Sequence, residues 1–118
     1  MQIWLRRAYV PAGRSDGTRV LVDRIWPRGV SRAAAAIDVW LQEVAPSTDL
    51  RHWFGHDPSR WEEFRRRYHR ELARRPEPVR RLQELVRDGR VTLVYAARDQ
   101  QHNNAVALKE YLQGRGTT

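Results

Sequence analysis

The stretch VTLVYA, residues 91–96, is the clearest strand in the sequence. It is almost continuously apolar and contains two valines and a threonine, which are β-branched. A short run of this kind is typical of a strand that is buried on both faces of a sheet. We therefore predict a central strand at residues 91–96, followed directly by the polar residues Arg98 and Asp99.

A second apolar run, TRVLVDRI at residues 18–25, is also predicted to be a buried strand. Predicted helices separate it from residues 91–96, which favours parallel pairing of the two strands. A further strand is predicted at residues 2–9. Because only a short loop connects it to residues 18–25, we expect these two strands either to pair antiparallel or to be separated within the sheet.

Four helices and one short helical turn are predicted from apolar spacing and capping residues. The predicted N-caps are Ser31, Ser47, Asp57 and Asn103. The helices cover residues 32–44, 57–74, 78–88 and 104–113, and the short turn covers residues 47–54. Strands alternating with helices indicate an α/β fold. We expect a small, mostly parallel sheet of three to four strands covered by about four to five helices, forming one domain at residues 1–114, with a flexible tail at residues 115–118.

Composition excludes several classes of function. The chain has 118 residues and no cysteine, so disulfides, thiolate metal sites and cysteine nucleophiles are absent. No run of about 18 apolar residues could span a membrane, and the N-terminus lacks the layout of a signal peptide. We expect a cytoplasmic protein with no membrane contact. The net charge of +8 permits an acidic partner but does not identify one. No feature of the sequence specifies an oligomeric state.

Polar residues follow both buried strands, and ligands of open α/β sheets bind outside the carboxyl ends of parallel strands. If the strands are parallel, these residues meet at one edge. Arginines and helix N-termini both suit an anion, so we predict a pocket for a small anion, in a protein that could be an enzyme on a phosphate- or carboxylate-bearing molecule. The predicted ligand-binding residues are Arg24, Trp26, Arg28, Arg98 and Asn103, and the predicted catalytic residues are Asp23, His56 and Asp99.

Each residue has a predicted role and, in some cases, an alternative. Arg28 and Arg98 would bind the anion, and Asp23 or Asp99 would orient them or act as a base. His56 would be the titrating group. Asp23 could instead be a structural ion-pair partner of Arg24 or Arg98. Trp26 could form a wall of the pocket, although a packing role is more common for a tryptophan.

No metal and no cofactor are predicted. His52 and His56 have the i, i+4 spacing of helical metal ligands, but Gly55 between them breaks the helix, and no third ligand stands out. Two further functions remain open. The arginine-rich helix at residues 58–75 could bind nucleic acid, although no recognition motif accompanies it. Alternatively, Trp53 and Phe54 could dock a protein partner or a second copy of the chain.

The sequence RVLVDRIWPRG, residues 19–29, resembles the RVLVDRLWPRG motif of the YeaO-like family of bacterial proteins. Further matches follow in order at residues 40–41, 45–48, 50–51, 53–56 and 92–97, so the resemblance covers nearly the whole chain. It implies a compact α/β fold but no established activity, substrate or catalytic residue. Members often carry Asn-His-Ala where this chain has Asn103-Asn104-Ala105, so a histidine at that place is missing here.

Overall fold

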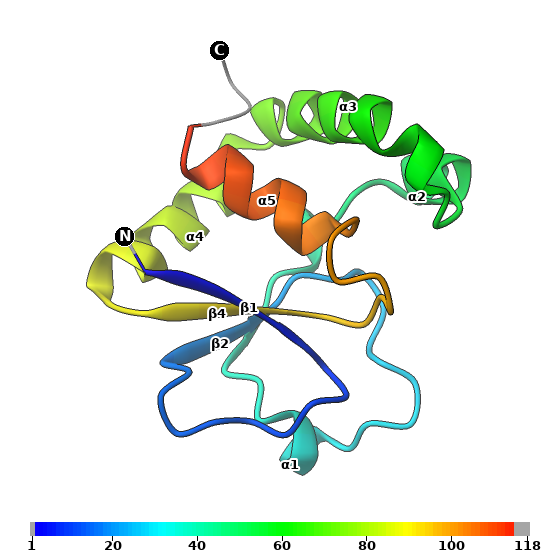
Figure 1. Cartoon of the computed structure of the whole chain (residues 1–118). Coiled ribbons are helices and arrows are strands. Elements are labelled where there is room, and N and C mark those ends of the chain that lie inside the picture. Colours follow the sequence, from blue (N-terminus) through cyan, green and yellow to red (C-terminus); the bar gives the residue numbers. More distant parts are fainter. Residues whose placement is uncertain (1, 115–118) are drawn as a thin grey trace.

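Four parallel strands form the centre of the computed structural model, which describes residues 2–114 (Figure 1). They lie in the order β1-β4-β2-β3. Their bounds are β1 Ile3–Arg7, β2 Thr18–Leu21, β3 Val39–Trp40 and β4 Val91–Tyr95. The predicted α/β class and parallel sheet are confirmed. The predicted tail, residues 115–118, lies outside the described residues.

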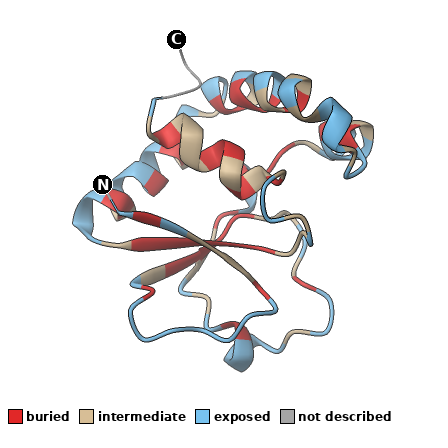
Figure 2. Cartoon of the chain, in the orientation of Figure 1, coloured by how far each residue is buried: buried red, intermediate tan, exposed pale blue. Residues whose placement is uncertain are grey.

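The central position of β4 follows from its composition. All five of its residues are buried, and it pairs with β1 on one side and β2 on the other (Figure 2). The parallel pairing of β2 with β4 is confirmed. Of the two arrangements expected for β1 and β2, the structure shows the one in which they are separated within the sheet, and they do not pair antiparallel. β2 ends at Leu21, earlier than predicted, although Val22 still donates a hydrogen bond to the Val94 carbonyl at 3.1 Å.

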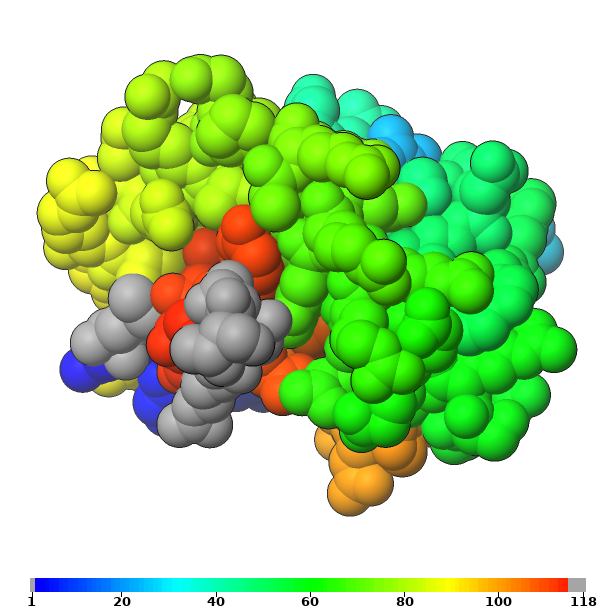
Figure 3. Space-filling model, turned by 90° about the horizontal axis from the view of Figure 1, so that it is seen from above, coloured from blue at the N-terminus to red at the C-terminus, as the bar shows by residue number. Residues whose placement is uncertain are grey.

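The longer helices cover one face of the sheet, with α5 packed on β1 and β4 and α3 packed on α5 (Figures 1 and 3). Their apolar stripes fill the main core, in which Phe64, Tyr68 and Leu72 of α3 are fully or almost fully buried. The helices are α1 Arg32–Ala35, α2 Thr48–Phe54, α3 Trp61–Ala73, α4 Pro76–Asp88 and α5 Asn104–Leu112, and short 3-10 turns form at Gln42–Val44 and Pro58–Arg60. None of the described helices is long and apolar enough to cross a membrane.

The four predicted N-caps are confirmed. Ser31, Ser47, Asp57 and Asn103 each accept a backbone N–H hydrogen bond from the first turn of the helix or 3-10 turn that they precede. The helix predicted at residues 57–74 differs at its start, because Asp57 caps a 3-10 turn that leads into α3. A 3-10 start of this kind is common at helix ends.

The helix predicted at residues 32–44 is wrong. Only α1 forms, and it stops where Ala36 takes a left-handed conformation with φ 49°. The Arg19 guanidinium on β2 accounts for this stop, because its Nε and Nη2 donate to the Ala35 carbonyl at 3.1 and 2.9 Å. Asp38 then exchanges hydrogen bonds with the Arg19 backbone at 2.8 and 2.9 Å, which draws the chain against β2 as the short strand β3.

The apolar residues of the segment 32–44 pack on both faces of the sheet. Ile37 and Trp40 pack with Leu21 in a small cluster on the face away from the long helices. Leu41 and Val44 belong to the main core on the other face. The spacing therefore imitates a single helical stripe, although its members point to two different layers.

Candidate functional site

The side chain of Asp23 joins the carboxyl ends of β2 and β4. One carboxylate oxygen accepts a hydrogen bond from Ala96 N–H at 2.9 Å, and the other accepts one from Asn104 Nδ2 at 3.0 Å. Asn104 Nδ2 also donates to the Val22 carbonyl at 3.0 Å, which fastens the start of α5 to the end of β2. The polar residues after the two strands therefore meet at one edge of the sheet, as predicted.

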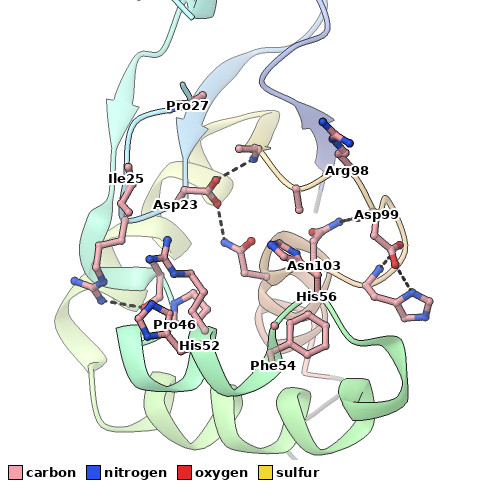
Figure 4. A pocket seen from close by; sticks show the side chains of 18 of the residues that line it. Asp23, Ile25, Pro27, Pro46, His52, Phe54, His56, Arg98, Asp99 and Asn103 are labelled. Carbon is pink, nitrogen blue, oxygen red and sulfur yellow. Dashed lines mark hydrogen bonds and ion pairs between the residues drawn. The ribbon is translucent and has the colours of Figure 1, made fainter. Parts of the chain in front are cut away.

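A cavity of about 960 Å³ opens at this edge, between the strand ends, α2 and the start of α5 (Figure 4). Every predicted site residue lines it. These residues are Asp23, Arg24, Trp26, Arg28, His56, Arg98, Asp99 and Asn103. Apolar walls are provided by Ile25, Pro27, Pro46, Phe54 and Phe64, among others. The structure brings the predicted residues together, and their catalytic and binding roles stay predictions.

Asp23 is a partly buried carboxyl in the middle of the cavity (Figure 4). Burial raises its pKa above the ordinary value, while the hydrogen bonds from Asn104 and Ala96 and the positive charge of Arg51 oppose that rise. Within residues 2–114 it forms no ion pair. The structural alternative, in which Asp23 pairs with Arg24 or Arg98, is therefore wrong.

Asp99 organises the loop between β4 and α5. One carboxylate oxygen accepts the N–H groups of Gln101 and His102 at 2.9 and 3.0 Å, and the other lies 2.9 Å from His102 Nδ1. The hydrogen bond from Gln101, followed by those from His102, holds the pKa of the Asp99 carboxyl below its ordinary value. Asp99 thereby orients His102, whose ring meets the Trp61 ring edge-on at 5.4 Å between centroids.

Asn103 is buried, and both ends of its amide are used inside the protein. Its oxygen accepts the Val106 N–H at 3.0 Å, which caps α5. Its nitrogen donates to the Asp99 carbonyl at 2.9 Å. These contacts make Asn103 a residue that shapes the wall of the cavity by holding the start of α5.

Replacing Asn103 with alanine is expected to lower the free energy of unfolding by about 1–2 kcal/mol, because α5 loses its N-cap. The measurement is urea unfolding followed by circular dichroism. Asn103→Asp is the matched comparison, since aspartate also caps helices but cannot donate to the Asp99 carbonyl, so it should recover only part of the loss. An alanine variant as stable as the wild type would show that the cap contributes nothing.

Four arginines line the cavity. Arg24 donates from Nη2 to the Ala45 carbonyl at 3.3 Å, whereas its Nε is buried and has no hydrogen-bond partner within residues 2–114. The guanidinium groups of Arg28, Arg51 and Arg98 form no hydrogen bond or ion pair in the described part of the chain, and all three residues are exposed. Arg98 lies at the rim of the cavity in Figure 4. The cavity therefore carries three cationic groups without partners.

Trp26 and His56 both line the cavity, and their surroundings differ. Trp26 donates from Nε1 to the Val30 carbonyl at 2.7 Å and packs edge-on against Trp40, with centroids 5.4 Å apart. It is chiefly a packing residue. His56 is exposed and has φ 57°, directly after the left-handed C-cap Gly55 of α2. His52 belongs to α2 and His56 does not, so the two histidines lack helical spacing.

The lining also contains polar residues that were not among the predicted site residues, including Arg51, Asn104 and His102. Arg51 reaches the cavity because α2 packs on α3 and presents one side to the strand ends. Asn104 was noted only as a place where a histidine is missing. The spacing of Asp99 and His102 was a usable signal, because an aspartate commonly bonds backbone N–H groups two or three residues later.

The arginines of α3 differ from those of the cavity, because several of them form ion pairs with glutamates. Glu63 lies 2.9, 2.8 and 3.7 Å from the guanidinium groups of Arg66, Arg67 and Arg70. Arg65 lies 2.8 Å from Glu110 of α5. This helix runs across the surface shown in Figure 3. Ion pairs thus offset much of its positive charge, and nucleic-acid binding by this face stays a prediction.

Trp53 and Phe54, the aromatic pair considered for docking a partner, mostly contact other residues of the protein. Phe54 is buried in the core and stacks on Phe64 with ring centroids 4.4 Å apart. Trp53 is half-buried, with the guanidinium groups of Arg60 and Arg67 at 5.3 and 4.3 Å from its ring. Phe54 is therefore not a docking residue. Among residues 2–114, no three histidine, aspartate or glutamate side chains lie close enough together to hold a metal ion.

Comparison with known proteins places this architecture in a family. The chain is 39% identical over 113 residues to the uncharacterised protein YeaO of Escherichia coli K12, which covers 96% of this chain and 98% of that one. It is 38% identical over 114 residues to an uncharacterised protein of Mycobacterium tuberculosis H37Rv, which covers 97% of this chain and 96% of that one. No solved structure matches. A family model described as the inactive DUF488-N3 subclade matches residues 2–117, and the chain therefore belongs to that family.

Proposed function

We propose that this protein binds a small anionic molecule in the cavity at the carboxyl ends of β2 and β4, and that it acts by binding the molecule rather than transforming it. The observation that carries the proposal is the set of three arginines on the cavity, Arg28, Arg51 and Arg98, whose guanidinium groups have no partner in the described residues. A guanidinium group presents a planar fork of donors that matches carboxylate and phosphate oxygens.

The contrast with α3 supports the proposal. Several arginines on that helix face glutamates three or four residues away, as expected of a solvated helix surface. The cavity instead holds four arginines and only two aspartates, and one of these, Asp99, is occupied by its own loop. Positive charge is therefore in excess where the chain is also hollow, and low-dielectric walls strengthen the attraction for an anion.

Arg24 adds to this positive charge. Its Nη2 donates to the Ala45 carbonyl at 3.3 Å and its Nε is buried. Its guanidinium group nevertheless belongs to a residue that lines the cavity, so it raises the positive potential that attracts an anion there.

Binding without turnover fits the description of the family as an inactive subclade. It also fits the site residues considered for catalysis. Asp99 is held in a turn by backbone donors, and His56 is exposed after the end of α2 without a carboxylate partner among the described residues. Under this proposal Asp23 orients the ligand instead of removing a proton from it.

The test is calorimetric titration with inorganic phosphate and, separately, with propionate at low ionic strength. Arg28→Ala and Arg51→Ala are each expected to weaken binding by about tenfold, because a hydrogen bond to a charged group is lost. Arg81→Ala removes the same charge from an exposed position on α4 and should leave affinity almost unchanged. Equal losses in all three variants would mean that net charge alone attracts the anion, and undetectable binding to the wild type would refute the proposal.

A further inference from the structure

Asp23 differs from the other carboxyl groups of the protein. Among the described residues, every other aspartate or glutamate that is buried or partly buried lies within 4.0 Å of an arginine or histidine nitrogen. These residues are Asp16, Asp57, Glu63, Glu71, Asp99 and Glu110. Asp23 lies in a cavity, is partly buried and has no such partner. Among the described residues, it is therefore a partly buried carboxyl without a cation at ion-pair distance.

Neither of the two hydrogen bonds that Asp23 accepts comes from a cationic group. Both come from neutral groups, the Ala96 N–H and the Asn104 amide. A carboxylate has about four acceptor positions, so two of them remain free. Figure 4 shows the carboxylate directed into the open part of the cavity. Arg51 is near enough to favour the charged form but makes no ion pair with it.

Asn104 adds a second free acceptor beside Asp23. Its Nδ2 is placed between the Val22 carbonyl and the Asp23 carboxylate, both 3.0 Å away, which defines the orientation of the amide. The amide oxygen consequently points elsewhere, and no hydrogen bond to it occurs among residues 2–114. The lining of the cavity thus includes free acceptor positions on Asp23 and Asn104 as well as the cationic groups of Arg28, Arg51 and Arg98.

We propose that the ligand is a small zwitterion, whose protonated amine is held by Asp23 and Asn104 while its anionic group is held by the arginines Arg28, Arg51 and Arg98 of the cavity lining. This inference rests on the proposed function and narrows it. A simple anion would meet repulsion from Asp23, because two like charges in a partly desolvated site repel strongly. An amine on the same molecule replaces this repulsion with a charge-assisted hydrogen bond.

The experiment uses pairs of probes that differ by one amine. O-phosphoethanolamine is compared with ethyl phosphate, and β-alanine with propionate, by calorimetric titration at neutral pH. In at least one pair the amine-bearing probe should bind about tenfold more tightly than its twin, and the pair that does so identifies the anionic group as phosphate or carboxylate. Asp23→Asn should abolish this preference, and it should strengthen binding of the amine-free anion, because the repulsion from the Asp23 carboxylate is removed.

Several results would overturn the inference. Equal affinities within both pairs would remove the amine site while leaving the proposed function intact, provided that Arg51→Ala still weakens binding of ethyl phosphate or propionate. A preference that survives in Asp23→Asn would show that another group recognises the amine. If none of the four probes binds, both proposals fail. Should Asp23→Asn not fold, the wild-type comparison within each pair still decides the matter, and Asn104→Ala serves as the second variant with a smaller expected loss of preference.

Discussion

Replacing Asp16 with alanine is expected to destabilise the protein by about 3 kcal/mol, because the substitution leaves the Arg19 guanidinium buried without its carboxylate. The two groups lie 2.6 Å apart, and their side chains are only 3% and 4% exposed. The Arg19 side chain also donates to the Ala35 carbonyl, so it cannot turn to solvent without releasing the end of α1. Loss of Asp16 therefore disturbs both β2 and the segment that leads into β3.

The effect of this substitution should depend on pH. Burial raises the pKa of the Asp16 carboxyl, but the hydrogen bond from Gly13 N–H and the charges of Arg19 and Arg6 outweigh it, so the pKa in the folded protein is lowered. A carboxyl with a lowered folded-state pKa stabilises the protein above its unfolded-state pKa, and the stabilisation disappears as pH falls through the folded-state value. The difference between wild type and Asp16→Ala should thus shrink below about pH 4.

Urea unfolding from pH 7 to pH 3 measures this dependence. Glu84→Ala provides the control, since Glu84 is exposed on α4 and forms no hydrogen bond or ion pair among the described residues, so its loss should change stability by less than about 0.5 kcal/mol. If Asp16→Ala is no more destabilising than Glu84→Ala at pH 7, the ion pair does not support the fold.

Replacing Gly17 with alanine is the second substitution with a large expected effect, a loss of about 2–4 kcal/mol. Gly17 has φ 68°, which a residue with a Cβ adopts only with strain. The added Cβ would overlap the Arg90 carbonyl oxygen and lie 2.9 Å from its carbon. That same oxygen accepts the Thr18 N–H at 3.0 Å, at the start of the β2–β4 pairing, so the strands would have to shift to make room.

A comparison with Gly29 separates the backbone strain at Gly17 from its close contact with the Arg90 carbonyl. It has a similar φ of 78°, but a Cβ there would meet no atom within 4 Å. Gly29→Ala should therefore cost only about 1–2 kcal/mol, the strain of the left-handed backbone. Thermal and urea unfolding of both variants measure the difference. Equal losses would show that strain alone matters, and that the contact between Gly17 and Arg90 is not tight.

The parts of the fold that local pattern determines were predictable. Residues 91–96 are apolar without interruption, and a strand of that kind belongs in the middle of a parallel sheet. The same reasoning placed Asp23 and Asp99 at one edge, because parallel strands end on the same side. The capping residues were equally clear, since an Asn or Ser before an apolar stripe satisfies the first free N–H groups of a helix.

The remaining features depend on contacts between distant residues. Helix α1 ends at Ala35 because Arg19, more than ten residues earlier, donates hydrogen bonds to the Ala35 carbonyl. Nothing in the sequence of residues 36–40 indicates this contact. Arg51 reaches the cavity only through the packing of α2 on α3. The bond between Asn104 and Asp23 joins residues 81 positions apart, so it appears only once the sheet is assembled.

The most direct test of the anion-binding cavity is an NMR titration of ¹⁵N-labelled protein with inorganic phosphate at low and moderate salt. We expect the largest amide shifts at Arg24, Arg28, Arg51 and Ala96 to Arg98, with saturation at a defined affinity and little change along α3. Shifts confined to Arg66 and Arg70 on α3, or shifts that grow without saturation across the whole basic surface, would contradict an anion site at the carboxyl ends of β2 and β4.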